Sequence, residues 1–153
     1  MISSKRKLAS VAVWLFVFGI SLGQANSTEA KQRVAIRFQK SPSGPGTWSG
    51  TGMANDGTAV TVGSVLTATR DTGRITHVVD FKFRFTPAET NQTVVVDLVG
   101  IINNVTGRVV LNGAVVSSAH PAVPVGARAH LSGQVTDNPT PFTVIGTIYM
   151  TIP

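Results

Sequence analysis

Short segments rich in threonine, valine and isoleucine, separated by turn signals, run from about residue 32 to the end of the chain. None of them sustains the helical period of apolar positions, whereas several alternate apolar and polar residues as a half-buried strand does. Glycine, proline, asparagine and aspartate gather between them, where turns need these residues. The sequence predicts eight strands, over residues 32–39, 47–54, 58–70, 74–86, 92–102, 108–117, 127–136 and 142–152.

Strands of this length and even spacing predict an antiparallel up-and-down meander. Closing the meander into a barrel removes both unpaired edges, so we expect an all-β, eight-stranded up-and-down barrel. A two-sheet β-sandwich would use the same strands and is the alternative. The sequence between residues 41 and 46 holds two prolines and two glycines, and it is predicted to be a loop.

Three turn glycines are each followed, six or seven residues later, by a glycine inside a predicted strand. The pairs are Gly57 with Gly63, Gly107 with Gly113, and Gly126 with Gly133. A glycine within a strand gives up packing, and it usually marks a bend or a close approach of two backbones. The second glycine of each pair is therefore expected to mark a corner of the barrel.

The first 25 residues predict a secretory signal peptide. Three basic residues at positions 5–7 precede an uncharged, mostly apolar run over residues 8–22, and a Gly-Gln-Ala tripeptide ends at residue 25. The run of about 15 residues is shorter than the roughly 20 that a membrane-spanning helix needs, although a retained N-terminal anchor is the alternative. We expect residues 26–153 to form a single secreted or periplasmic domain with no stable membrane span.

Composition narrows the function classes. Three of the 13 basic residues precede residue 26, which leaves 10 Lys and Arg against 7 Asp and Glu, or about +3. No basic stripe is interleaved with aromatic residues, so we expect no nucleic-acid partner. The early basic group from Lys31 to Lys40 is interpreted as a solvated strand face, with contact to an anionic surface as the alternative.

The chain has no cysteine. Disulfides, thiol catalysis and cysteine-ligated zinc are therefore excluded. A cysteine-free, exported, Gly/Thr/Val-rich domain suits a bacterial envelope or secreted protein. An outer-membrane barrel is not favoured, because Trp48 and Tyr149 are the only residues after position 25 of the type that forms its aromatic girdles.

The segment 74–86 alternates most regularly, and one of its faces carries Ile75, His77, Val79, Phe81, Phe83 and Phe85. Three aromatic rings on one side of a strand are a large hydrophobic load for one domain. A closed eight-stranded barrel is just wide enough to be filled by side chains or to hold one small ligand. The rings are expected to fill the core or line a cavity, with packing against another copy of the chain as the alternative. His77 is interpreted either as a ligand contact or pocket base, or as a hydrogen-bonded core histidine.

Arg128, His130 and Ser132 fall on one face of the segment 127–136 by their period-two spacing. Together they would hold an anionic group of a ligand, or they would form an ordinary polar strand face. No glycine-rich stretch fits a phosphate loop or a dinucleotide-binding motif, and no serine has the context of a nucleophile elbow. We assign no catalytic residue, no metal ligand and no cofactor.

Turn spacing and glycine pattern carry a resemblance to a known superfamily. Gly-Thr-Gly at 50–52 precedes Asn-Asp-Gly at 55–57, and Asn-Val-Thr-Gly-Arg at 104–108 precedes Gly-Ala-Val at 113–115. Over residues 47–152 the chain resembles the dirigent and allene-oxide-cyclase-like barrels. The resemblance implies an eight-stranded barrel, often with a central apolar cavity, and often a trimer. No diagnostic catalytic motif matches, so no catalytic residue is carried over. The chain also resembles a lipocalin-like barrel, but Gly-Thr-Trp at 46–48 follows the first predicted strand instead of lying near its start.

These observations predict an exported small barrel that binds a small apolar ligand in its lumen. His77, Phe81, Phe83 and Phe85 would line the cavity, and Arg128 and His130 would orient a polar head group near its mouth. The alternative is a structural or adhesive surface module with a packed core and no ligand. A cyclase- or isomerase-like enzyme acting in a barrel cavity is the third hypothesis. A homo-oligomer is compatible with all of them.

Overall fold

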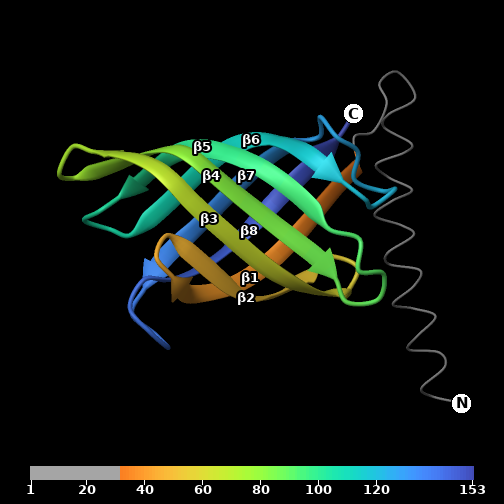
Figure 1. Cartoon of the computed structure of the whole chain (residues 1–153), viewed down its shortest axis with the longest axis horizontal. Coiled ribbons are helices and arrows are strands. Elements are labelled where there is room, and N and C mark those ends of the chain that lie inside the picture. Colours follow the sequence, from red (N-terminus) through yellow and green to blue (C-terminus); the bar gives the residue numbers. More distant parts are fainter. Residues whose placement is uncertain (1–31) are drawn as a thin grey trace, which may run out of the picture. The chain divides into compact units, whose positions relative to one another are not determined.

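The computed structural model describes residues 32–153, which form a closed barrel of eight antiparallel strands, each paired with the next along the chain (Figure 1). The predicted all-β up-and-down barrel is confirmed. The strands are β1 (Gln32–Gly44), β2 (Thr47–Ala54), β3 (Ala59–Asp71), β4 (Ile75–Pro87), β5 (Val94–Asn103), β6 (Arg108–Ser118), β7 (Arg128–Thr136) and β8 (Thr143–Ile152). The predicted signal peptide lies outside the described residues. Within residues 32–153 there is no helix of the length and hydropathy needed to span a membrane.

The first strand is longer than the sequence predicts. The expected loop over residues 41–46 is instead the end of β1, which continues to Gly44 and leaves a tight turn at Pro45 and Gly46. Pro42 pairs with Trp48 of β2, and the register slips between Pro42 and Gly44. An irregular end of a ladder tolerates a proline because no backbone N–H is required there. This extension places Lys40 well inside a regular strand.

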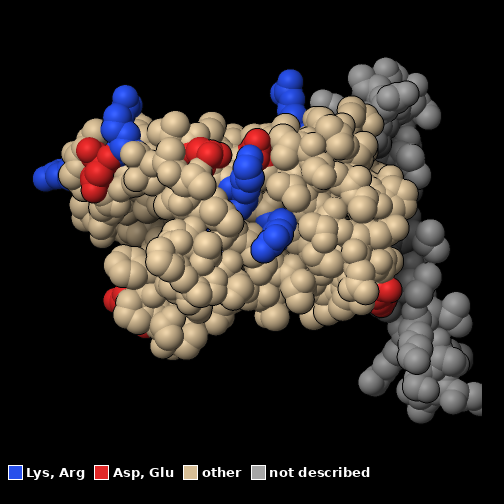
Figure 2. Space-filling model, in the orientation of Figure 1, with Lys and Arg blue, Asp and Glu red and all other residues tan. Residues whose placement is uncertain are grey.

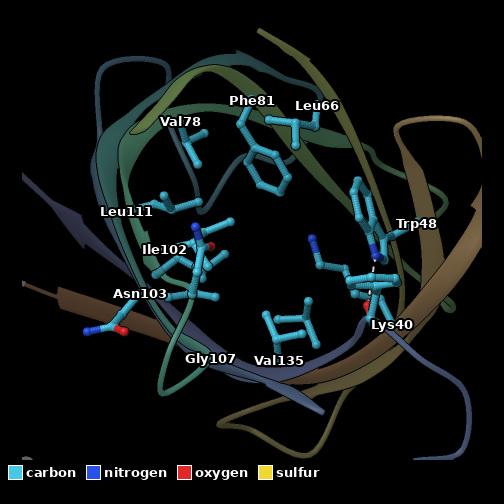
Figure 3. A pocket seen from close by; sticks show the side chains of 15 residues that line it. Lys40, Trp48, Leu66, Val78, Phe81, Ile102, Asn103, Gly107, Leu111 and Val135 are labelled. Carbon is cyan, nitrogen blue, oxygen red and sulfur yellow. Dashed lines mark hydrogen bonds between the residues drawn. The ribbon is translucent and has the colours of Figure 1, made fainter. Parts of the chain in front are cut away.

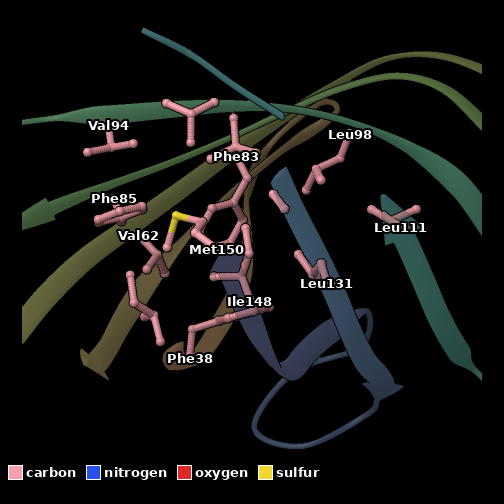
Figure 4. Packing of buried hydrophobic residues seen from close by; sticks show 14 of the residues in the cluster. Phe38, Val62, Phe83, Phe85, Val94, Leu98, Leu111, Leu131, Ile148 and Met150 are labelled. Atoms are coloured by element: carbon pink, nitrogen blue, oxygen red, sulfur yellow. The ribbon is translucent and has the colours of Figure 1, made fainter. Parts of the chain in front are cut away.

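Inward-facing side chains fill the middle of the barrel (Figure 4). Phe83 of β4 is fully buried, and its ring lies 5.0 Å from that of Phe38 of β1, centroid to centroid, in a tilted arrangement. Ile148 and Met150 of β8 are also fully buried. Tilted aromatic pairs at this separation add to the stabilisation from buried apolar area. The predicted inward orientation of the phenylalanines on this strand is therefore what the barrel adopts.

A bulge in β4 breaks the alternation that the sequence predicts. The ladder to β5 pairs Val78 with Gly100 and Phe81 with Leu98, so that two residues of β4 oppose the single residue Val99. An extra residue in one strand moves the side chains beyond it to the opposite face. Val78 is accordingly buried, and Val79 is exposed. The expectation that Val79 shares the apolar face of the phenylalanines is a misreading that this bulge corrects.

Gly57, Gly107 and Gly126 all have positive φ values, of 87°, 76° and 92°, the backbone conformation for which turns favour glycine. The mid-strand glycines differ from one another. A Cβ on Gly113 would lie 1.8 Å from the carbonyl oxygen of Asp97, whereas the atom nearest to a Cβ on Gly63 would be Nε of the Arg84 side chain, at 3.3 Å. Gly113 therefore marks a close approach of β6 to β5, and Gly63 does not.

Charged side chains on the outer face are sparse. Figure 2 shows positive and negative residues scattered over the visible face of the barrel without a single-sign patch. Lys82 of β4 forms an ion pair with Asp97 of β5, with 2.7 Å between Nζ and Oδ1, and both side chains are about half exposed. Such solvent-exposed pairs contribute little to stability.

Candidate functional site

A cavity of about 290 Å³ lies in the lumen near the turn that joins β5 to β6 and the loop that joins β7 to β8. Its walls are apolar except for Lys40 and two asparagines, Asn103 and Asn104, which belong to the β5–β6 end. The volume is at the lower end of the range for small-molecule sites, about 300–1,000 Å³. The cavity is thus large enough for one small apolar molecule.

Period-two alternation delivers the lining side chains from strands all around the barrel (Figure 3). Phe81 and Val78 come from β4, on either side of its bulge, and Leu66 comes from β3. In Figure 3, Leu111 of β6 lies next to Val78, and Val135 of β7 lies across the lumen from Phe81. The bulge has a direct consequence here, because it allows both Val78 and Phe81 to point inward.

Lys40 is the charged side chain of this lumen. It occupies the inward register of β1 after Ile36 and Phe38, and only 3% of its surface is exposed. Its Nζ donates a hydrogen bond of 2.6 Å to Oγ of Ser64, an equally buried residue of β3. In Figure 3 the amine points into the open lumen among the lining side chains.

Aromatic rings surround the Lys40 amine. The distances from Nζ to the ring centroids are 4.4 Å for Phe81, 5.3 Å for Phe83, and 5.7 Å for both Phe38 and Trp48. A cation within about 6 Å of a ring is attracted to the negative face of its π-system. The rings therefore partly compensate the protonated amine for the water it has lost.

That compensation is incomplete. Among residues 32–153 no carboxylate oxygen lies within 4.0 Å of the Lys40 nitrogen. Burial lowers the pKa of the Lys40 amine from 10.5 to about 7, because an apolar surrounding disfavours the charged form. Near neutral pH the cavity therefore holds an amine that is a hydrogen-bond donor, a cation and, when deprotonated, a nucleophile.

A hydrogen bond connects two residues that line the cavity, Trp48 and Phe142. Nε1 of Trp48 donates to the backbone carbonyl of Phe142, at 3.0 Å, and so joins β2 to the loop before β8. Phe142 lines the cavity although 68% of its surface is exposed, and its φ of 64° is rare for a bulky residue. Strained backbone of this kind often occurs beside functional sites.

The predicted phenylalanines lie at successive depths of the lumen. Phe81 lines the cavity, and Phe83 packs beneath it beside Phe38. Phe85 is buried two residues further along β4, and it lines a separate recess near Val123 of the β6–β7 connection. Phe81 therefore forms part of the cavity wall, Phe83 supports that wall, and Phe85 lies beyond the cavity.

The predicted polar residues lie outside the cavity. His77 precedes the β4 bulge, next to the inward-facing Val78, and does not line the cavity, so it is not among the phenylalanines as the sequence predicts. Arg128 and His130 are exposed, whereas Ala129 and Leu131, which alternate with them along β7, are buried. They face an open groove on the outer surface, where His130 Nδ1 lies 2.7 Å from Oδ1 of Asn112. None of these three side chains lines the lumenal cavity.

Sequence reasoning missed Lys40 and Ser64. The signal was present, because Lys40 continues the inward series of Ile36 and Phe38 at the same period of two. The charge of Lys40 gives the opposite indication, because a basic group such as that from Lys31 to Lys40 is typical of a solvated strand face. Ser64 had no distinguishing context, since only its place opposite Phe83 and Trp48 in the ladders makes it lumenal.

Comparison with family models, with curated proteins and with solved structures gives no match to this chain. The resemblance to dirigent and allene-oxide-cyclase-like barrels stays a prediction.

Proposed function

We propose that the barrel binds one small apolar molecule, with a polar group that meets the Lys40 amine. The observation that carries the proposal is an apolar cavity of about 290 Å³ with a single buried amine on its wall. Burial of apolar ligand surface supplies the affinity, and the amine sets the orientation of the ligand. A bulk water molecule takes up about 30 Å³, so the space suits roughly ten non-hydrogen atoms.

Filling the cavity should abolish binding without unfolding the barrel. Leu66→Trp places an indole ring inside the lumen, whereas Val65→Trp places the same ring on the outer face of the same strand. We expect 1-nonanol, an apolar alcohol of about this size, to bind the wild-type protein and the Val65 variant equally. The Leu66 variant should bind it at least tenfold more weakly, as measured by titration calorimetry.

Thermal unfolding of both variants provides the control, since each must show one cooperative transition for the comparison to hold. Absence of any heat of binding from wild-type protein, or equal affinity of the two variants, would contradict a ligand site in the lumen. A structural or adhesive module with no ligand would then be the better hypothesis. Secretion of the domain stays part of the proposal, on the strength of the predicted signal peptide.

A further inference from the structure

We propose that the Lys40 amine captures its ligand covalently, by forming a reversible imine with the carbonyl carbon of a small apolar aldehyde. This inference rests on the proposed ligand binding and names the chemical class of the ligand. It is carried by the position of the amine on the cavity wall, 2.6 Å from its hydrogen-bond acceptor Ser64 and 4.4 Å from the centre of the Phe81 ring.

The surroundings of the amine favour its reactive form. A lysine nucleophile must lose its proton, and an apolar pocket achieves this by disfavouring the cation. With a pKa of about 7, roughly half of the Lys40 amine is neutral at pH 7, whereas the hydrogen bond from Lys82 to Asp97 raises the pKa of that exposed amine. The amine donates an N–H to Ser64, which leaves the nitrogen lone pair free to attack.

The reaction balances without any co-reactant. The nitrogen lone pair attacks the carbonyl carbon, a C–N bond forms, and the π electrons move to the oxygen. A proton then moves from nitrogen to that oxygen and gives a carbinolamine. The second N–H proton and the hydroxyl group leave as water while the C=N bond forms, so the products are the imine and one water molecule. Nothing is oxidised or reduced, and hydrolysis reverses the sequence.

The geometry favours an aldehyde over two other ligand chemistries. A carboxylate would bring a second charge into an apolar cavity, and the desolvation penalty of a buried ion pair often offsets its attraction. An ester that acylates serine would need the Ser64 hydroxyl on the cavity wall, but the lumenal cavity is lined by Lys40 and not by Ser64. A neutral carbonyl group meets neither obstacle.

Reductive trapping tests the inference. The full chain is incubated at pH 7 with nonanal and sodium cyanoborohydride, which reduces an imine to a stable secondary amine, and the modified lysines are located by peptide mass spectrometry. We expect Lys40 to be alkylated at least tenfold faster than Lys82, the exposed lysine on the outer face. Lys40→Met should lose this modification, whereas Lys82→Met, which changes an exposed residue of the outer face, should keep the modification of Lys40.

The outcomes separate this inference from the function on which it rests. If 1-nonanol binds the wild-type protein but nonanal labels Lys40 no faster than Lys82, the imine is overturned and the proposed binding site stands. If neither reagent engages the lumen, both proposals fail. Nonanoate that binds far more tightly than 1-nonanol, with no trapping by nonanal, would also overturn the imine and identify Lys40 as the partner of an anion.

Discussion

Replacing Lys40 with methionine is expected to stabilise the barrel at pH 7 by about 2 kcal/mol, because it removes a buried charge while keeping a flexible side chain of similar volume. The pKa of the amine falls from 10.5 to about 7 on folding. At roughly 1.4 kcal/mol per unit, a shift of this size corresponds to a penalty on the order of 5 kcal/mol. The variant also leaves the buried Ser64 hydroxyl without its hydrogen-bond donor, which costs about 1–3 kcal/mol and offsets part of the stabilisation.

The dependence on pH identifies the cause. Because the folded-state pKa is depressed, the unfolded chain binds more protons than the barrel between about pH 7 and pH 10.5. The destabilisation of the barrel by Lys40 is therefore at its full size below pH 7, decreases as the pH rises from about 7 to 10.5, and is absent above that range. The stability advantage of Lys40→Met should shrink in the same way from pH 7 to pH 10.

Urea unfolding of wild type and Lys40→Met across this pH range gives the difference in their free energies of unfolding, because the titration of all groups that the two proteins share cancels in that difference. Lys82→Met is the matched control, because it removes an exposed lysine whose ion pair is open to solvent. Its stability difference from wild type should be small over most of the range. A Lys40→Met advantage that stays constant with pH would show that the amine keeps an ordinary pKa in the barrel. A double variant with Ser64→Ala should be more stable than Lys40→Met alone, since no buried hydroxyl then lacks a partner.

The architecture was predictable because its determinants are local. Alternation and turn chemistry place most strand ends within one or two residues of the structure, and Gly57 and Gly107 occur at the positive φ values that turn residues supply. The end of β1 was not predictable in this way. Pro42 argues against a strand on local grounds, and only the slipped register opposite Trp48 accommodates it.

The site was less predictable because it depends on relations between strands. The β4 bulge opposes two residues to Val99 of β5, and no pattern within β4 alone shows which residues the partner will leave unpaired. The bulge separates the face of His77 from that of Phe81. Lys40 was not predictable for another reason: its period-two position indicates an inward side chain, whereas its charge indicates an exposed one. Departures from local rules are expected to concentrate at functional or strained positions, and Lys40 is such a departure.

Gly113→Ala is expected to destabilise the barrel by about 3 kcal/mol, because the added methyl group meets backbone that cannot yield. The new Cβ would lie 1.8 Å from the carbonyl oxygen of Asp97 and 3.1 Å from Cα of Leu98. Both atoms belong to β5, which is hydrogen-bonded to β4 as well as to β6. Relief of the clash would therefore require a shift of the ladder on both sides, and in a closed barrel such a shift is passed to the remaining strands.

Gly63→Ala is the matched comparison, since Gly63 is also a mid-strand glycine in the turn-to-strand pattern of the sequence. Its Cβ would meet Nε of Arg84 at 3.3 Å, at the far end of a flexible side chain that can move aside. An alanine there should be neutral, or should stabilise by up to about 0.5–1 kcal/mol through the lower entropy of the unfolded chain. Urea unfolding of the two variants measures the contrast. Equal stabilities would show that the spacing of glycines, read from the sequence as barrel corners, reflects turn chemistry alone. A loss of stability in Gly113→Ala alone would instead show that the two backbones approach closely where β5 pairs with β6, the strand that also supplies Leu111 to the cavity wall.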